Sequence, residues 1–210
     1  MNRPLILLGG GGHCKSVIDV AVSAGYTILG ILDKPEEVGK MVLDYEVIGV
    51  DDDIPLYVDK AEFIITVGFI KDPTLRIKLY NKVLNAGGKF ATLIASTAHV
   101  SKYATIGTGT VIMHQAVVNA GAVIGDNVII NTFANIEHDV HIGNQCHIST
   151  GAIINGNANI ADETFVGSQS VVNQGINFAG GVIASLSVLT KSTTQRGIYA
   201  GCPAKLINTL

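Results

Sequence analysis

The sequence predicts two domains of different architecture, an α/β head with a small parallel sheet and then a parallel β-helix. Two observations lead to this prediction. Over residues 1–93, short apolar runs alternate with segments in which apolar residues recur at helical spacing. From Ile94 onward, an apolar residue recurs at every sixth position as far as Phe178. We therefore expect the head at residues 1–93 and the β-helix, with a closing segment, at residues 94–210.

The head begins with a short apolar strand, Leu5–Leu8, which runs into four glycines, Gly9–Gly12. Strands that alternate with helices indicate a parallel sheet covered by helices, as in a Rossmann-like fold. The glycine run lies between the first strand and the first helix, where free backbone N–H groups can bind phosphate. We expect strands at residues 5–8, 27–32, 63–67 and 90–94, and helices at residues 14–24 and 75–86.

The six-residue repeat excludes an α-helix, because 3.6 residues per turn cannot keep one face in register with it. A chain that forms a short strand and turns a corner every six residues satisfies the pattern. Three such strands close one triangular coil of about 18 residues, and stacked coils share one core. The apolar column that fills this core comprises Ile94, Val100, Ile106, Ile112, Val118, Ile124, Ile130, Ile136, Ile142, Ile148, Ile154, Ile160, Val166, Val172 and Phe178.

Residues that are 18 positions apart should stack on one face of the β-helix. This register places His138 between Ala120 and Gly156. The register also places His114 in one column with the hydroxyl residues Thr132, Thr150 and Ser168.

Some positions that point outward from the coils are also apolar. Outward apolar residues favour burial between subunits, so we predict a trimer. The residues concerned are Val111, Val117, Ile129, Ile153 and Val171.

Composition argues against several classes of protein. Of the 210 residues, 48% are apolar and only 15% charged, which excludes a disordered chain. The net charge of −3 argues against a nucleic-acid-binding protein. The apolar run at Leu5–Leu8 is too short for a signal peptide or a membrane span, so we expect neither. The three cysteines cannot all pair, which favours free thiols and a cytoplasmic location.

The repeat resembles the left-handed parallel β-helix of the hexapeptide-repeat acyltransferases, and only this resemblance implies the left hand. The ending Gly201-Cys202-Pro203-Ala204-Lys205 also resembles the close common in that superfamily. The whole chain resembles sugar acetyltransferases with a nucleotide-binding head, which include UDP-4-amino-sugar N-acetyltransferases and sialic acid O-acetyltransferases. This narrower resemblance rests on Gly9 to His13, Asp33, Asn131-Thr132 and Glu137-His138-Asp139.

The resemblance also implies roles for individual residues. It implies that His138 is the general base and that Asp139 orients it. For acetyl-CoA it implies contacts from His147, Gly156 and Ser168. For the nucleotide sugar it implies contacts from Gly11, Gly12, His13, Asp33 and Gly68.

The resemblance further implies acetyl-CoA as co-substrate, no metal, and a homotrimer with active sites between subunits. One stretch departs from the family pattern, because Ala184 to Ser187 stand where relatives often have a glycine-rich segment. No cofactor contact is transferred to that stretch. The basic residues that follow the last coil are either ligands of the CoA phosphates or solvated charges; they are Lys191, Arg196 and Lys205.

These residue types suit acetyl transfer to an amine. Histidine can accept a proton from an attacking amine near neutral pH, and an adjacent carboxylate can fix its tautomer. A backbone N–H or His147 could donate a hydrogen bond to the oxyanion. Asp33, at the end of the second strand, suits a ribose hydroxyl. About 90 residues precede the repeat and leave room for one mononucleotide unit, which favours UDP over NAD.

We therefore predict direct transfer of an acetyl group from acetyl-CoA to the amino group of a UDP-linked 4-amino-4,6-dideoxy sugar. No cysteine is placed near His138 by motif or register, although Cys146 is close in sequence. O-acetylation of a sialic acid or a similar sugar stays open. A zinc enzyme resembling the gamma carbonic anhydrases is conceivable from His138, His141 and His147. In a regulatory or scaffold protein, the glycine run would serve packing and His138 would be a surface residue.

Overall fold

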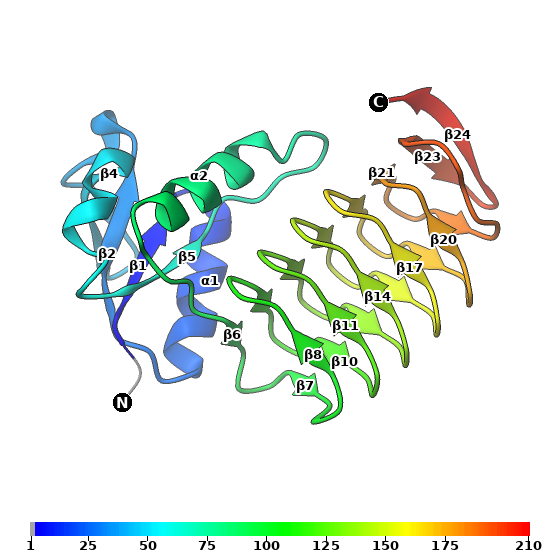
Figure 1. Ribbon diagram of the computed structural model, residues 1–210, viewed down its shortest axis with the longest axis horizontal. Helices are drawn as coiled ribbons and strands as arrows, with labels where there is room; N and C mark the ends of the chain where they lie inside the picture. The colour runs from blue at the N-terminus through cyan, green and yellow to red at the C-terminus, as the bar shows by residue number, and fades with distance from the viewer. Residues whose placement is uncertain (1–2) are drawn as a thin grey trace.

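The computed structural model describes residues 3–210, and Figure 1 shows an α/β head packed beside the first coils of a long β-helix. The head contains one five-stranded sheet in the order β3-β4-β2-β1-β5. All of its pairings are parallel except that of β3 with β4. The strands are β1 (Leu5–Leu8), β2 (Ile28–Asp33), β3 (Met41–Val42), β4 (Tyr45–Val50) and β5 (Glu62–Ile65).

Two α-helices, α1 (Gly12–Ser23) and α2 (Thr74–Asn85), cover opposite faces of this sheet. Each face of the sheet has its own apolar core. Alternate residues of β1 belong to different cores, because successive side chains of a strand point to opposite faces. Leu5 and Leu7 belong to the core that includes α1. Ile6 and Leu8 belong to the core that includes α2. The head also has two 3₁₀ helices, η1 (Pro35–Glu37) and η2 (Asp51–Leu56).

The segment expected as the last head strand, residues 90–94, is not one strand. Phe90 makes a single parallel bridge to Phe63 of the head sheet. Residues 93–94 form β6 (Leu93–Ile94), which pairs instead with β9 of the β-helix. The apolar run therefore pairs first with the head sheet and then with the β-helix. The apolar character of these residues does not show where the pairing strand changes. The β3–β4 hairpin was not expected from the sequence either.

The β-helix has three sheets, numbered here in the order in which the chain visits them, and their strands pair in parallel except β23 with β24. Sheet 1 contains β6, β9 (Val111–Ile112), β12 (Ile129–Ile130), β15 (His147–Ile148), β18 (Phe165–Val166), β21 (Gly181–Ile183), β23 (Gly197–Gly201) and β24 (Ala204–Thr209). Sheet 2 contains β7 (His99–Val100), β10 (Val117–Val118), β13 (Asn135–Ile136), β16 (Ile153–Ile154), β19 (Val171–Val172) and β22 (Val188–Leu189). Sheet 3 contains β8 (Thr105–Ile106), β11 (Val123–Ile124), β14 (His141–Ile142), β17 (Asn159–Ile160) and β20 (Asn177–Phe178).

The 18-residue register is confirmed from β6 to β20, where Ile130 pairs with both Ile112 and Ile148. Each apolar residue of the six-residue column is the second residue of its strand. Nearly all of them are buried in one continuous core. Ile94 is exposed, because it lies in the first coil and has a neighbouring strand on one side only.

Part of the outer face of sheet 1 packs against the head of the same chain. Val111 is fully buried in the same core as α1, and Ile129 is also fully buried within the chain. The expectation that these two residues lie between subunits was therefore wrong. Val117, Ile153 and Val171 lie on sheet 2 and stay partly exposed. Within residues 3–210, neither α-helix is long and apolar enough to cross a membrane.

Candidate active site

The glycine run at the start of α1 leaves open space beside the backbone. Gly11 is the N-cap residue, with φ −72° and ψ −170°, and no side chain caps the first turn of the helix. A Cβ atom built on Gly11 or Gly12 would meet no atom within 4 Å. Neither glycine is therefore required by local packing. The first free N–H groups of α1 face a region that a phosphate could occupy.

Asp33 holds this glycine run in place. Its Oδ2 accepts a hydrogen bond of 2.6 Å from the backbone N–H of Gly10, and its Oδ1 accepts one of 2.8 Å from Lys34 N–H. A cleft of about 250 Å³ lies beside it at the carboxyl ends of β2 and β4. In a parallel sheet this edge is where ligands bind. The cleft is also lined by Asp51, Asp52, Lys78 and Lys82.

His13 and Gly68 of the head meet His147 of the β-helix. The rings of His13 and His147 have centroids 6.2 Å apart. A Cβ atom on Gly68 would lie 3.9 Å from His147 Cε1 and 4.0 Å from His13 Cγ. The buried Nε2 of His13 has no hydrogen-bond partner among the described residues. Two residues predicted to contact the nucleotide sugar are thus neighbours of one predicted to contact acetyl-CoA.

His147 joins the two domains through both of its ring nitrogens. Nδ1 donates a hydrogen bond of 2.9 Å to the carbonyl of Phe69 in the head. Nε2 lies 3.2 Å from Asn131 Nδ2, which donates to it in this tautomer. The ring packs edge-on against Phe165, with centroids 5.1 Å apart. The proposed contact of His147 with acetyl-CoA stays a prediction, because the ring nitrogens are used here within the chain.

Both of these histidines resist protonation. Burial lowers the pKa of His147 to about 4. Burial, and then the nearby His147, lower the pKa of His13 to about 4. Both imidazoles are therefore neutral at pH 7.

We expect stability to fall as the pH falls from about 6.5 to about 4. In the unfolded chain a histidine takes up a proton near pH 6.5, whereas in the folded protein these two histidines take up a proton only near pH 4. Below pH 6.5 the unfolded state therefore binds more protons, and the free energy of unfolding decreases. Urea midpoints measured between pH 7.5 and 4.5 at one protein concentration test this.

The matched variants for this measurement are His147→Asn and His141→Asn. The asparagine at 147 does not titrate, so the loss of stability on acidification should be smaller. His141 is exposed on sheet 3, and its replacement should leave the wild-type pH dependence. An unchanged pH dependence in His147→Asn would contradict the assignment.

His138 lies in the turn between β13 and β14, at the corner between sheets 2 and 3. Its Nδ1 is 2.9 Å from Asp139 Oδ2, and both side chains are more than half exposed. Asp139 has φ 59°, a left-handed conformation that aspartate tolerates better than most residues. A Cβ atom on Gly156 would lie 2.6 Å from His138 Nε2, so only glycine leaves room for this ring. The predicted stacking of His138 on Gly156 is confirmed.

A polar groove of about 570 Å³ runs along this corner from His138. Glu137 is fixed at its edge, because its Oε1 and Oε2 accept hydrogen bonds from Asn135 Nδ2 at 2.9 Å and Asn119 Nδ2 at 3.1 Å. The other polar residues of the groove were not expected from the sequence, although the 18-residue register aligns two of them with Glu137. These residues are Asn155, Asn173, Gln174 and Thr190.

One chain does not bring all of the predicted site residues together. The head lies on sheet 1, whereas His138 and Gly156 lie at the opposite corner of the triangle. Ser168 lies at the corner between sheets 1 and 2, where its Oγ is 2.9 Å from Ser149 Oγ. A single site that uses all of these residues therefore needs more than one chain.

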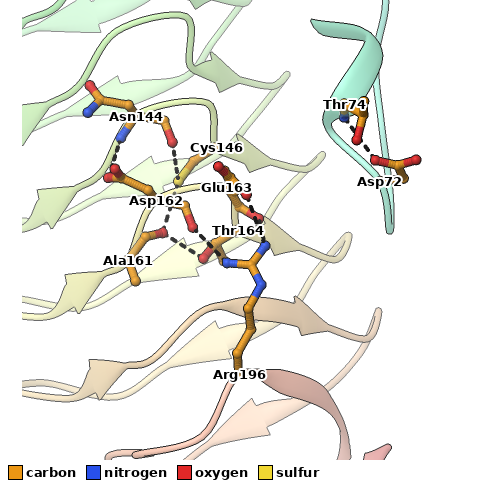
Figure 2. A network of polar contacts seen from close by, with 9 residues as sticks. All are labelled: Asp72, Thr74, Asn144, Cys146, Ala161, Asp162, Glu163, Thr164 and Arg196. Carbon is orange, nitrogen blue, oxygen red and sulfur yellow. Dashed lines mark hydrogen bonds and ion pairs between the residues drawn. The ribbon is translucent and has the colours of Figure 1, made fainter. Parts of the chain in front are cut away.

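Cys146 is not available as a nucleophile. Burial raises the pKa of its thiol to about 12. As Figure 2 shows, its Sγ lies against backbone oxygens of the coil, with Ala161 O at 3.2 Å. The same network holds Arg196, whose Nη2 donates to Glu163 O at 3.1 Å. Arg196 therefore fastens the segment after the last coil to the β-helix.

Within the described residues, no three side chains of histidine, cysteine, aspartate or glutamate converge as metal ligands. His138, His141 and His147 lie on a corner, on sheet 3 and on sheet 1, respectively. A zinc site built from them would need ligands from neighbouring subunits.

Comparison with known proteins extends these observations. Residues 4–83 match the PglD N-terminal domain family, and residues 121–156 match the bacterial transferase hexapeptide (six repeats) family. The acetyltransferase domain of PglB from Neisseria gonorrhoeae FA1090, solved with acetyl coenzyme A, is 31% identical with a TM-score of 0.91. The match covers 99% of this chain and 100% of that one. The chain belongs to the acetyl-CoA-dependent sugar acetyltransferases of the hexapeptide-repeat type.

Two further matches involve a solved enzyme and a viral protein. This acetyltransferase is 28% identical to PerB from Caulobacter crescentus, solved with CoA and GDP-perosamine, with a TM-score of 0.89 and coverage of 97% and 96%. It is 33% identical over 106 residues to the uncharacterized protein L142 of Acanthamoeba polyphaga mimivirus, half of this chain but only 20% of that protein. The predicted family and the predicted fold, an α/β head followed by a left-handed β-helix, are confirmed.

Proposed function

We propose that this acetyltransferase moves the acetyl group of acetyl-CoA to the amino group of a UDP-linked 4-amino-4,6-dideoxy sugar. The observation that carries the proposal is the His138–Asp139 pair at 2.9 Å beside a polar groove. The PglB domain solved with acetyl coenzyme A and PerB solved with CoA and GDP-perosamine support the two substrate classes. Three free thiols favour the cytoplasm as the location.

In this proposal, His138 Nε2 accepts a proton as the amine nitrogen attacks the thioester carbonyl. Asp139 holds Nδ1–H and stabilises the imidazolium that forms. The tetrahedral intermediate then collapses, the C–S bond breaks, and the CoA sulfur leaves with the proton from the imidazolium. The products are an N-acetylated sugar and CoA. Direct transfer is proposed because the buried Cys146 thiol has a pKa raised to about 12.

The head would hold the nucleotide. The uncapped first turn of α1 would bind the phosphates, and Asp33 would lie near the ribose. GDP is the rival of UDP, because PerB was solved with a GDP-linked sugar.

An acceptor panel tests this substrate assignment. Release of CoA is followed with UDP-linked and GDP-linked 4-amino sugars and with free sialic acid. Turnover with the UDP-linked sugar is expected. Turnover with sialic acid alone would instead support O-acetylation and overturn the proposal.

The active site would be shared between subunits of a trimer. The head covers sheet 1, and the β-helix core separates it from the His138 corner of the same chain. A sugar held by one head would therefore meet the His138 of a neighbour. The partly exposed apolar residues of sheet 2 would be buried against that neighbour. They are Val117, Ile153 and Val171.

Replacing Gly11 with valine should raise KM for the nucleotide sugar by about tenfold or more, the effect of losing about 1.4 kcal/mol of binding. The new side chain would enter the open space beside the first turn of α1. KM for acetyl-CoA should change less than about twofold, within the scatter of such comparisons. The fold should survive, because φ −72° is allowed for valine and the poorer N-cap costs about 1 kcal/mol. Equal weakening of both substrates would mean that the glycine run serves packing.

A further inference from the structure

Arg76 of α2 is buried at a cost in desolvation free energy. Its side chain is 1% exposed, and no carboxylate lies within 4.0 Å of it among the described residues. Burial lowers its pKa to about 9. An apolar side chain of similar volume often costs a protein less than a buried charge. The guanidinium is therefore best explained by the hydrogen bonds that it makes.

Those hydrogen bonds connect the head to the β-helix. Nη2 donates to the backbone carbonyl of Asn127 at 2.9 Å and also to its side-chain oxygen. Asn127 lies at the corner between sheets 3 and 1, and its amide donates in turn to Gln145 of the next coil. Nη1 donates to the carbonyl of Val67, just beyond β5. One planar group thus fixes Val67 relative to two successive coils.

The residues after Val67 are held by the same face of the β-helix. The carbonyl of Phe69 accepts the hydrogen bond from His147 Nδ1 at 2.9 Å. The Phe69 ring packs in one cluster with Phe165 and Val182 on sheet 1. Gly68 is left between these two attachments, about 4 Å from both His13 and His147. The position of Gly68 beside the glycine run thus depends on attachments at both ends of the segment Val67–Phe69.

We infer that Arg76 is a positioning residue for the nucleotide sugar: it anchors the segment Val67–Phe69 so that Gly68 lies in register with the glycine run. The inference rests on the proposed function, since Gly68 and His13 are taken as nucleotide-sugar contacts. Arg76 does not touch the substrate in this scheme. The fork geometry of the guanidinium matters more than its charge, because two acceptors on different domains must be bound at once.

The test compares Arg76→Lys and Arg76→Met with Tyr80→Phe. Lysine keeps the charge and loses the fork, whereas methionine loses both. Both should raise KM for the nucleotide sugar by about tenfold, the loss of one or two buried hydrogen bonds, with KM for acetyl-CoA nearly unchanged. Tyr80 also links α2 to the β-helix, with its hydroxyl 3.4 Å from Asp126 Oδ2, but makes no hydrogen bond to Val67. Tyr80→Phe should keep the wild-type KM.

Three results would overturn the inference. Wild-type KM in a folded Arg76→Met would show that the anchor is dispensable. Full recovery in Arg76→Lys would show that charge alone matters. Equal changes in both KM values would show a general structural role.

If the Arg76 variants do not fold, a second variant and a second measurement still test the inference. Asn127→Gly removes the side-chain acceptor at φ 52°, where glycine is comfortable, and should raise the nucleotide-sugar KM by about threefold. Hydrogen exchange of the peptide covering residues 66–72 should speed up, with no change in strands β9 to β18. Wild-type exchange and wild-type KM in Asn127→Gly would overturn the inference.

Failure of the proposed function gives a different result. If the wild-type protein acetylates no nucleotide sugar, calorimetry with UDP and GDP replaces KM, and the exchange measurement stands unchanged. Weaker nucleotide binding in the Arg76 variants would then still support the positioning role, and unchanged binding would reject it.

Discussion

Replacing His138 with alanine should lower kcat by about 10²–10⁴, the usual contribution of a general base. The melting temperature should change little, because the ring is more than half exposed and packs mainly over Gly156. Steady-state kinetics with both substrates saturating, together with thermal unfolding of the same preparation, measure both effects.

Two variants serve as controls for His138→Ala. Asp139→Asn keeps the base and removes the charge beside Nδ1, so it should lower kcat by a smaller factor. His141→Ala removes an exposed histidine three residues away on sheet 3 and should keep the wild-type kcat. A folded His138→Ala enzyme with near wild-type turnover would leave substrate positioning as the only source of the rate.

The β-helix could be predicted from the sequence because one residue per strand fills its core. Ile130 and Ile148 are partners in the structure because they are 18 residues apart in the chain. The same register predicted that His138 lies over Gly156. In such a fold the spacing of two residues in the sequence determines whether they are neighbours in space, so the six-residue period alone predicts contacts within the β-helix.

The position of the head could not be predicted in this way. Val111 on sheet 1 and Val117 on sheet 2 are both outward valines, yet only Val111 is covered by the head. Which sheet the head covers depends on non-local contacts, such as that of Arg76 with Asn127. In the sequence Arg76 reads as a surface residue of a helix, because charge normally indicates exposure.

The joining of the two halves of the site was also hidden from the sequence. His13, Gly68 and His147 were assigned to two different ligands, yet the structure brings them together. His138 is instead far from them in chain topology, at the corner opposite the head. A site that needs both His138 and the group of His13, Gly68 and His147 must therefore take them from neighbouring chains.

At a nucleotide-sugar concentration well below the wild-type KM, mixed trimers of two impaired variants should be more active than either variant alone. Gly11→Val chains have a damaged head and an intact His138, and His138→Ala chains have the reverse. If each site takes its head from one chain and its His138 from the next, every trimer that contains both variants has one intact site in three, about a third of the wild-type number. Co-expressed chains with two different tags, purified through both tags, would provide these trimers.

The recovered rate distinguishes a shared site from a site within one chain. If each chain used its own head and its own His138, every site in the mixture would carry one of the two lesions. The mixture would then show only the sum of the residual activities of the two variants. A chain with both substitutions, co-expressed with His138→Ala, is the matched control. It has no intact His138 in any subunit, so it should recover nothing in either arrangement.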